Sequence, residues 1–235
     1  MEVSVAVEKR RPVKETPLQR LKRDVAAFAV ALLRVLALSL LLSPLLIASF
    51  LTVDLPFRLF DGLAAPDAAY KPSDWLSIGG VIMAGAPLLG ILFARRFGGE
   101  EASRAVTASW GLAALATFAE LSYLAPALEA SDMPAARYVM AFVASAMAGQ
   151  YLAVNIYDVI RGGGRWWRAP LYAALAGYAL ETLIYFPGVY AGSGAPWINW
   201  MIGGLAVRAL IAFLFLPIYA LLRNSLKPRG GYGGK

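Results

Sequence analysis

The sequence contains neither cysteine nor histidine, and only 16% of its 235 residues are charged. Without cysteine there is no disulfide framework and no thiolate metal site. Without histidine, a proton relay must run on carboxylates or water, and a metal site would have oxygen ligands alone. We therefore expect no metal and no cofactor. No serine stands in a recognisable arrangement with a base partner, so nucleophilic catalysis has little to build on and we do not expect an enzyme.

Long apolar runs take the place of charge. Hydrophobic residues make up 59% of the chain, and the mean hydropathy is +0.60. About 20 apolar residues in a helix cross a hydrocarbon core of roughly 30 Å. Runs of this kind occupy residues 25–53, 75–93, 106–128, 138–160, 169–191 and 198–222. The sequence thus predicts an all-α, polytopic membrane protein: a six-transmembrane-helix bundle at 25–222, between a basic arm at 1–24 and a basic, glycine-rich tail at 223–235.

The positive charge of the chain is unevenly distributed. Of its 22 Lys and Arg residues, 17 fall in the arm, the tail and segments 94–105 and 161–168, which six spans would place on one side. The opposite loops hold three, namely Arg58, Lys71 and Arg137. This bias predicts an N-in and C-in topology in the lipid bilayer. It also accounts for the net charge of +7 without a nucleic-acid partner. In the arm, Pro12 and Pro17 discourage a long early helix.

The second and third spans carry features with two interpretations each. The second contains the helix-interrupting residues Gly79, Gly80, Gly85, Pro87 and Gly90. Interrupted spans line transporter sites, but small residues also allow close helix packing. Segment 94–105 is predicted to be a short turn. In the third span, Glu120 lies past the centre, where it could reach the headgroups or line a pathway.

Ionisable residues lie near the middle of two spans, and an amide lies in a third. Glu181 is on the fifth span, Arg208 on the sixth and Gln150 on the fourth. A charged carboxylate at the bilayer centre costs about 2.5–3.5 kcal/mol on insertion scales, so Glu181 should face protein or a cavity. Buried opposite charges should pair, since an isolated one is very costly. Glu181 and Arg208 therefore either lock the bundle or belong to a ligand site, flanked by Tyr178 and Tyr185.

A further polar face follows Gln150 on the fourth span. Tyr151, Asn155 and Asp158 are spaced by four and three residues, which places them on one side of a helix. We count Tyr151 and Asn155 among the candidate binding residues. Ordinary bundle packing remains the alternative for each tyrosine.

Four stretches resemble a known family. They are GQYLAVNIYDVIRGGGRWWRAP at 149–170, ALETLIYF at 179–186, VRALIAFLFLPIYALL at 207–222 and FARRFGGEEASRAV at 93–106. These resemble the bacterial queuosine-precursor transporters, also called the vitamin-uptake-like (VUT) family. The likeness extends from about Phe50 onward and is most specific in the last three spans.

The resemblance implies a six-helix carrier in the bacterial inner (plasma) membrane that takes up 7-deazaguanine bases such as preQ0 or preQ1. It also implies that the family's polar positions fall on Gln150, Glu181 and Arg208. The chain departs from the family pattern in two places. Acids that the family has near Ile91 and at Ala153 are missing here. Glu181 and Arg208 stand where Asp and Lys are common.

The candidate residues suit a guanine-like base. Adjacent ring N–H and amino donors match a carboxylate that accepts two hydrogen bonds, and Gln150 could serve another edge. The predicted substrate site comprises Gln150, Glu181, Arg208, Tyr151, Asn155, Tyr178 and Tyr185. Two alternatives stay open: a substrate-binding membrane subunit that needs an energising partner, and a carrier for a different small molecule. The sequence leaves the oligomeric state and the coupling ion open.

Overall fold

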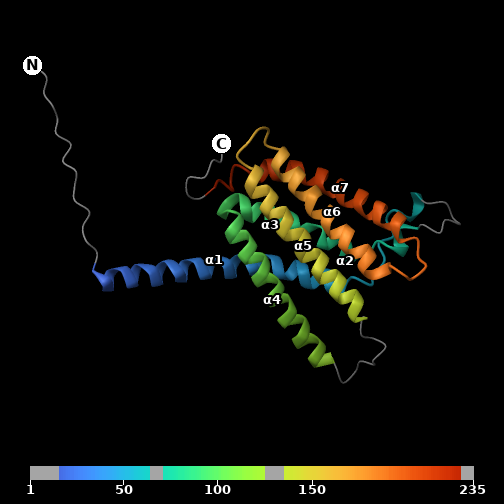
Figure 1. Ribbon diagram of the computed structural model, residues 1–235, viewed down its shortest axis with the longest axis horizontal. Coiled ribbons are helices and arrows are strands. Elements are labelled where there is room, and N and C mark those ends of the chain that lie inside the picture. The colour runs from blue at the N-terminus through green and yellow to red at the C-terminus, as the bar shows by residue number, and fades with distance from the viewer. Residues whose placement is uncertain (1–15, 64–70, 125–134, 229–235) are drawn as a thin grey trace, which may run out of the picture. The chain divides into compact units, whose positions relative to one another are not determined.

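The computed structural model describes residues 16–63, 71–124 and 135–228, and these ranges contain helices and turns but no β-strand. Figure 1 labels the helices along the chain. The helices are α1 (Pro17–Leu51), α2 (Ile78–Met83), α3 (Gly85–Phe97), α4 (Gly99–Leu124), α5 (Ala136–Ile160), α6 (Arg168–Tyr190) and α7 (Trp197–Leu222). Two single 3₁₀ turns, Asp61–Leu63 and Pro72–Asp74, lie between α1 and α2.

Four stretches are long and apolar enough to cross a membrane by length and composition: α1, α2 with α3, α5 and α7. Counting α2 and α3 as one broken span, the described helices agree with the predicted number of six. Helices α4 and α6 fall outside the apolar set. In α6, ten residues are buried inside the bundle, Glu181 among them.

The chain divides into two compact units, and the second is Val35–Lys235. Helix α1 has residues 17–34 in the first unit and residues 35–51 in the second. It begins at Pro17 rather than Val25, so the expectation that Pro17 discourages an early helix is wrong. Proline is tolerated in the first turn because its missing N–H would be unpaired there anyway. A reciprocal pair of hydrogen bonds between Thr16 and Gln19 caps this start. Residues 1–15 of the predicted arm and 229–235 of the tail lie outside the described ranges.

The predicted turn at 94–105 is also wrong, because a single residue joins α3 to α4. Gly98 has φ 96°, a left-handed conformation that glycine adopts without strain. The first N–H of α4, on Gly99, donates to Asp158 Oδ1 at 2.9 Å. The charges that suggested a loop are helix-end charges instead. Arg95 and Arg96 are in the last turn of α3, and Glu100 and Glu101 in the first turn of α4.

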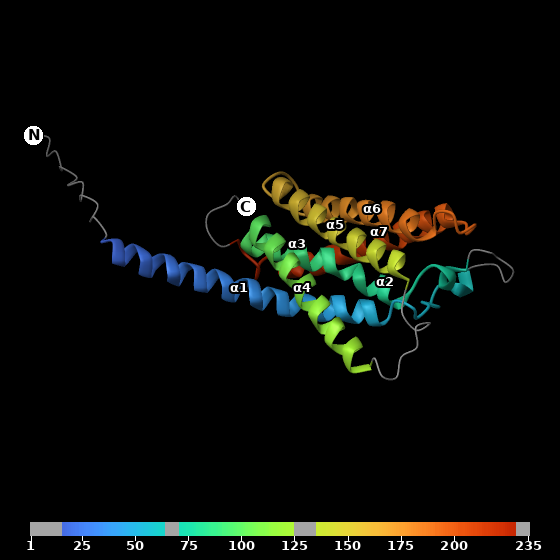
Figure 2. The same cartoon turned by 60° about the horizontal axis from the view of Figure 1, so that its bottom comes forward.

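Helix α6 packs between α5 and α7 in the second unit (Figure 1), and Figure 2 shows it in orange beside the yellow α5. Helices α5 and α6 approach each other closely at Gly149 and Gly177. A Cβ atom on Gly149 would lie 2.8 Å from the Gly177 carbonyl oxygen, and one on Gly177 would lie 2.6 Å from the Gly149 carbonyl oxygen. Small residues allow such backbone contact between membrane helices. This contact sets the level at which α5 faces Glu181.

The predicted interruption of the second span is confirmed, since the helix breaks at Ala84 between α2 and α3. Ser77 caps α2 by accepting the Gly80 N–H at 3.0 Å. At the break, the hydroxyl of the buried Tyr178 donates to the Ala84 carbonyl. The close-packing interpretation holds for Gly79, because a Cβ there would overlap the backbone of α1 at Ser49.

Candidate functional site

The predicted pair between the fifth and sixth spans forms. Arg208 Nη2 on α7 donates to Glu181 Oε1 on α6 at 2.9 Å. Both residues are buried, with 3% of Glu181 and 8% of Arg208 exposed. Each lies about halfway along a helix of 23 or 26 residues, so the pair is at mid-depth of the bundle. An opposite charge at this distance offsets the cost of removing both groups from water.

This pair does not satisfy all of its own hydrogen-bonding groups. Glu181 Oε2 and Arg208 Nε are buried and have no hydrogen-bond partner among the described residues. The hydroxyl of Thr182, next to Glu181, is also buried without one. Buried polar atoms are nearly always paired, so a cluster of unpaired ones marks a place where water or a ligand binds. One acceptor and one donor are therefore available at the pair.

A small cavity adjoins Glu181 and Arg208. The volume that the centre of a water molecule can occupy is about 20 Å³, enough for about one water. Its walls come from four helices and the segment before α2. Besides the charged pair, the wall residues are Val53, Trp75, Leu76, Ser77, Gly80, Phe142, Tyr185 and Phe186. The broken second span thus contributes to the cavity, as expected of an interrupted helix.

Aromatic rings form one side of this cavity. Tyr185 contacts Phe186 edge-on with ring centroids 5.2 Å apart, and it contacts Phe142 at 6.4 Å. Gly204 leaves room for the Phe186 ring, which would lie 3.0 Å from a Cβ on that glycine. The site therefore combines an ion pair with flat apolar walls.

Two of the predicted binding residues are engaged elsewhere. Gln150 is fully buried on α5, but its Oε1 accepts from Trp110 Nε1 at 3.2 Å, and its Nε2 lies 3.7 Å from Met83 Sδ. It does not line the cavity; its neighbour Gly149 faces Glu181 instead. Tyr178 is engaged at the Ala84 break and also lies outside the cavity wall.

The polar face after Gln150 is directed at α4. The Tyr151 hydroxyl contacts Thr107 Oγ1 at 2.5 Å, and Asp158 accepts the Gly99 N–H at 2.9 Å. Asn155 is exposed and donates back to the Tyr151 carbonyl of its own helix at 2.8 Å. Tyr151 and Asp158 thus attach α4 to α5, and neither they nor Asn155 line the cavity beside the Glu181–Arg208 pair. Glu120 also lies outside the cavity wall.

We call the two ends of the second unit the Trp75 end, where α1 and α6 finish, and the Arg95 end, where α3, α5 and α7 finish. A polar network of the buried Tyr157 and Tyr219 with the half-buried Arg95 closes the Arg95 end. The Tyr157 and Tyr219 hydroxyls are 2.7 Å apart, and Arg95 Nη1 donates to Tyr219 at 3.1 Å. Arg95 Nη2 also donates to the Arg223 carbonyl at 2.7 Å. Helices α3, α5 and α7 are thereby joined on this side of the ion pair.

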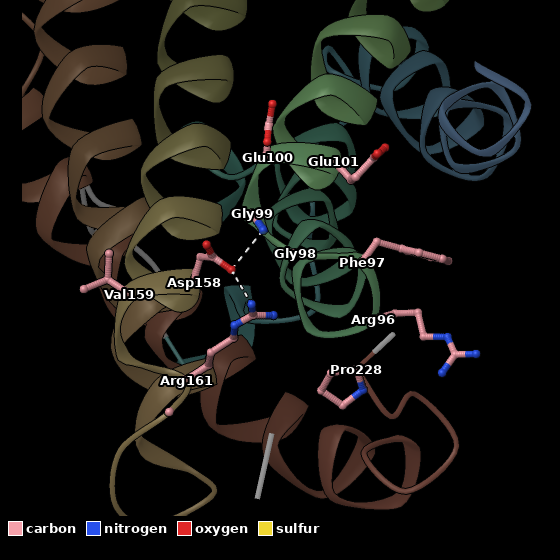
Figure 3. A pocket seen from close by; sticks show the side chains of 11 residues that line it. Arg96, Phe97, Gly98, Gly99, Glu100, Glu101, Asp158, Val159, Arg161 and Pro228 are labelled. Atoms are coloured by element: carbon pink, nitrogen blue, oxygen red, sulfur yellow. Dashed lines mark hydrogen bonds and ion pairs between the residues drawn. The ribbon is translucent and has the colours of Figure 1, made fainter. Parts of the chain in front are cut away.

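A hollow of about 540 Å³ also lies at the Arg95 end (Figure 3). Asp158 in its wall is held by the Gly99 N–H and by Arg161 Nη2 at 3.2 Å. Arg161 in turn donates to the Ala94 carbonyl at 2.9 Å. These interactions connect the ends of α3, α4 and α5. We therefore assign the polar residues of this hollow to stabilising the α3–α4 turn and not to binding a substrate.

Several cavity residues escaped the sequence analysis, notably Trp75, Phe142 and Phe186. Trp75 is the first residue of the interrupted span, and this position before a broken helix could have indicated that it lines a site. Nothing local distinguishes Phe142 or Phe186 from other apolar residues in spans of similar composition. Only the helix packing directs them to the cavity.

Comparison with known proteins identifies the family. Residues 77–222 match the family described as "Putative vitamin uptake transporter". The chain belongs to this family. The matched region includes α2 to α7 and both members of the ion pair. Membership places the protein among multi-pass membrane transporters and not among enzymes, as the sequence predicted.

A curated relative gives more detail over part of the chain. Over 94 residues the chain is 32% identical to the queuosine precursor transporter of Escherichia coli (strain K12). The match covers 37% of this chain and 42% of that protein, so the chain spans less than half the length of the relative it matches. No solved structure matches the chain.

Proposed function

We propose that this protein takes up a guanine-like base, a 7-deazaguanine precursor of queuosine, across the membrane. The binding site is centred on Glu181 and Arg208, with Tyr185 as a stacking wall. The observation that carries the proposal is the buried pair with an unpaired carboxylate oxygen and an unpaired guanidinium nitrogen beside a cavity. Intramembrane ionisable residues commonly mark transport sites. The partial identity to a queuosine precursor transporter supports the substrate class.

The chemistry of the pair fits such a base. Glu181 Oε2 accepts from the ring N–H, and Oε1 accepts the exocyclic amino group beside or in place of Arg208. The Arg208 Nε–H then donates to a ring acceptor. Stacking on the Tyr185 ring adds roughly 1–3 kcal/mol, by analogy with base binding in nucleic-acid-binding proteins. Gln150, Tyr151, Asn155 and Tyr178 contribute only if the helices rearrange around the bound base.

The cavity is smaller than a bicyclic base, so the described conformation is closed and the substrate enters by rearrangement. This is the behaviour of a carrier that works by alternating access, with its site between two gates. The Arg95, Tyr157 and Tyr219 network forms the gate at the Arg95 end. The carrier cycle opens the two ends in turn.

For the topology, we propose that the Arg95 end faces the cytoplasm of a bacterium, with the protein in the inner membrane. The excess of Lys and Arg in segments on that side supports this orientation. The domain plan follows: residues 1–24 as a basic cytoplasmic arm, 25–222 as the transmembrane domain and 223–235 as a basic tail. Fusions of a cytoplasmic or periplasmic reporter after residue 98 or residue 193 test it, and activity of the periplasmic reporter after residue 98 would reverse the orientation.

The central test measures uptake of a labelled 7-deazaguanine base in cells lacking their own transporter. Glu181→Gln preserves the size of the side chain but removes the charge, and we expect uptake to fall to background. Glu120→Gln is the matched control, since Glu120 is an acid on α4 that lies outside the cavity wall, and uptake by this variant should persist. Normal uptake by Glu181→Gln at equal membrane level would remove this residue from the mechanism.

Reconstitution separates a carrier from a substrate-binding subunit. The purified protein in liposomes should accumulate or equilibrate the base without any partner. Binding of the base without uptake would instead indicate a subunit that requires an energising partner.

A further inference from the structure

A second hollow lies at the Trp75 end, between the first two turns of α7 and the segment before α2. It has a volume of about 410 Å³ and is lined by Trp75, Asn199, Trp200 and Gly203. Small-molecule sites fall in the range of about 300–1,000 Å³, so a planar ring system fits here. We call this hollow the vestibule. The cavity beside the ion pair, with a volume of about 20 Å³, is much smaller.

Trp75 is common to the vestibule and to the cavity at Glu181 and Arg208. No other described residue lines both. Gly203 lines the vestibule, whereas Arg208 lines the cavity from the same helix at one to two turns farther in. A solute in the vestibule therefore meets the Trp75 indole before it reaches the ion pair.

The Trp75 ring lies against the backbone of α7 at a glycine. A Cβ on Gly203 would be 2.8 Å from Trp75 Cζ2 and 2.9 Å from Cη2. The indole therefore occupies the space in which any larger residue would place its side chain. Trp75 itself follows a 3₁₀ turn and precedes the capped start of α2, so rotation of the ring does not require a long helix to move.

The vestibule has the groups that a flat heteroaromatic ring needs. Trp75 and Trp200 offer ring faces for stacking. Asn199 is exposed and carries both a donor and an acceptor.

The geometry points to Trp75 as the gate of the Trp75 end, separating an entry vestibule for planar heteroaromatic solutes from the central ion pair. The indole lies on Gly203 in the closed state and rotates away to admit the solute. This inference depends on the proposed function only for the identity of the solute. The barrier itself can be tested without any substrate.

The absence of cysteine from the chain gives a clean background for thiol labelling. Single reporters are introduced as Ser77→Cys, in the cavity wall, and Asn199→Cys, in the vestibule. The purified protein in detergent is treated with a small charged methanethiosulfonate reagent, and the labelling rate is followed by mass spectrometry. We expect Asn199→Cys to react fast and Ser77→Cys to react slowly while Trp75 is present.

Removal of the Trp75 ring should then change only the labelling rate of Ser77→Cys, the reporter in the cavity wall. A closed protein opens with a minor population of about 0.1–10%, so Trp75→Ala should raise the Ser77→Cys rate by about 10- to 1,000-fold. Gly203→Ala, which displaces the ring without removing it, should raise the rate as well. Trp200→Ala is the matched control, because it removes an indole from the vestibule alone and should leave the Ser77→Cys rate unchanged.

Glu181→Cys serves as a second inner reporter in case the Ser77 substitution disturbs the start of α2. Each variant is first checked for a single symmetric peak in size-exclusion chromatography. Fast labelling of both inner reporters with Trp75 in place, or equal slow labelling after its removal, would overturn the gate. Slow labelling of Asn199→Cys would overturn the vestibule. Failure of the deazaguanine uptake assay would leave these labelling results standing, so the two proposals fail separately.

Discussion

The Glu181–Arg208 pair yields the most decisive prediction, because removing one charge should destabilise the protein more than removing both. In Glu181→Gln, the Arg208 guanidinium stays buried without its counter-charge. In Arg208→Gln, the Glu181 carboxylate stays buried without its counter-charge. Breaking a buried pair from one side costs about 3–5 kcal/mol of unfolding free energy. The double variant Glu181→Gln with Arg208→Gln leaves no buried charge, and two amides can still form a hydrogen bond.

The geometry of the pair gives the expected size of the change in unfolding free energy. One hydrogen bond of 2.9 Å joins the pair, while Glu181 Oε2 and Arg208 Nε remain unpaired. Attraction between charges about 4 Å apart at an effective dielectric constant of about 20 is about 4 kcal/mol, before desolvation is subtracted. We therefore expect each single variant to lose about 3 kcal/mol and the double variant to recover about 2 kcal/mol of that loss.

Stability and transport are measured on the same preparations. Unfolding in mixed micelles of increasing SDS content gives the free energy, and labelled-base uptake gives the activity. Recovered stability with uptake still at background is the expected result for the double variant, because the substrate needs the charges that stability does not. Wild-type uptake by the double variant would show that the pair only locks the bundle. Single variants as stable as the wild type would refute the energetic reasoning itself.

Three further predictions concern the surroundings of the site. Gly149→Ala places a Cβ 2.8 Å from the facing backbone carbonyl of α6 and should cost about 1–3 kcal/mol in the same unfolding assay; Gly111→Ala, with nothing within 4 Å, should cost nothing. Tyr178→Phe removes the hydroxyl that bonds the carbonyl at the α2–α3 break and should cost about 1 kcal/mol, while the KM for uptake stays unchanged. Arg95→Gln should increase hydrogen–deuterium exchange at the end of α7, where Arg95 binds the Tyr219 hydroxyl and the carbonyl of Arg223, the residue after the helix; the exposed Arg104→Gln should not. An altered KM in the Tyr178 variant, a loss of stability in the Gly111 variant, or equal exchange in both arginine variants would contradict the assigned contacts.

The sequence alone determined the helices and the depth of their polar residues. Hydropathy is a local property, so the apolar runs placed α1, α5, α6 and α7 within a few residues of their described bounds. The exception is the start of α1 at Pro17. The same local argument put Glu181 and Arg208 at mid-depth, and the cost of an isolated buried charge was enough to pair them.

Tertiary structure decided which faces of those helices meet. Spans that are apolar on all sides have no polar stripe to mark the face that is buried in protein. Gln150 could therefore turn to Trp110, and Tyr178 to the carbonyl at the helix break, without a trace in local sequence. The α3–α4 turn was missed for a related reason, since its charges complement helix ends and look the same in a loop. The place of Trp75 between two hollows depends on a glycine 128 positions later, Gly203, and only packing brings them together.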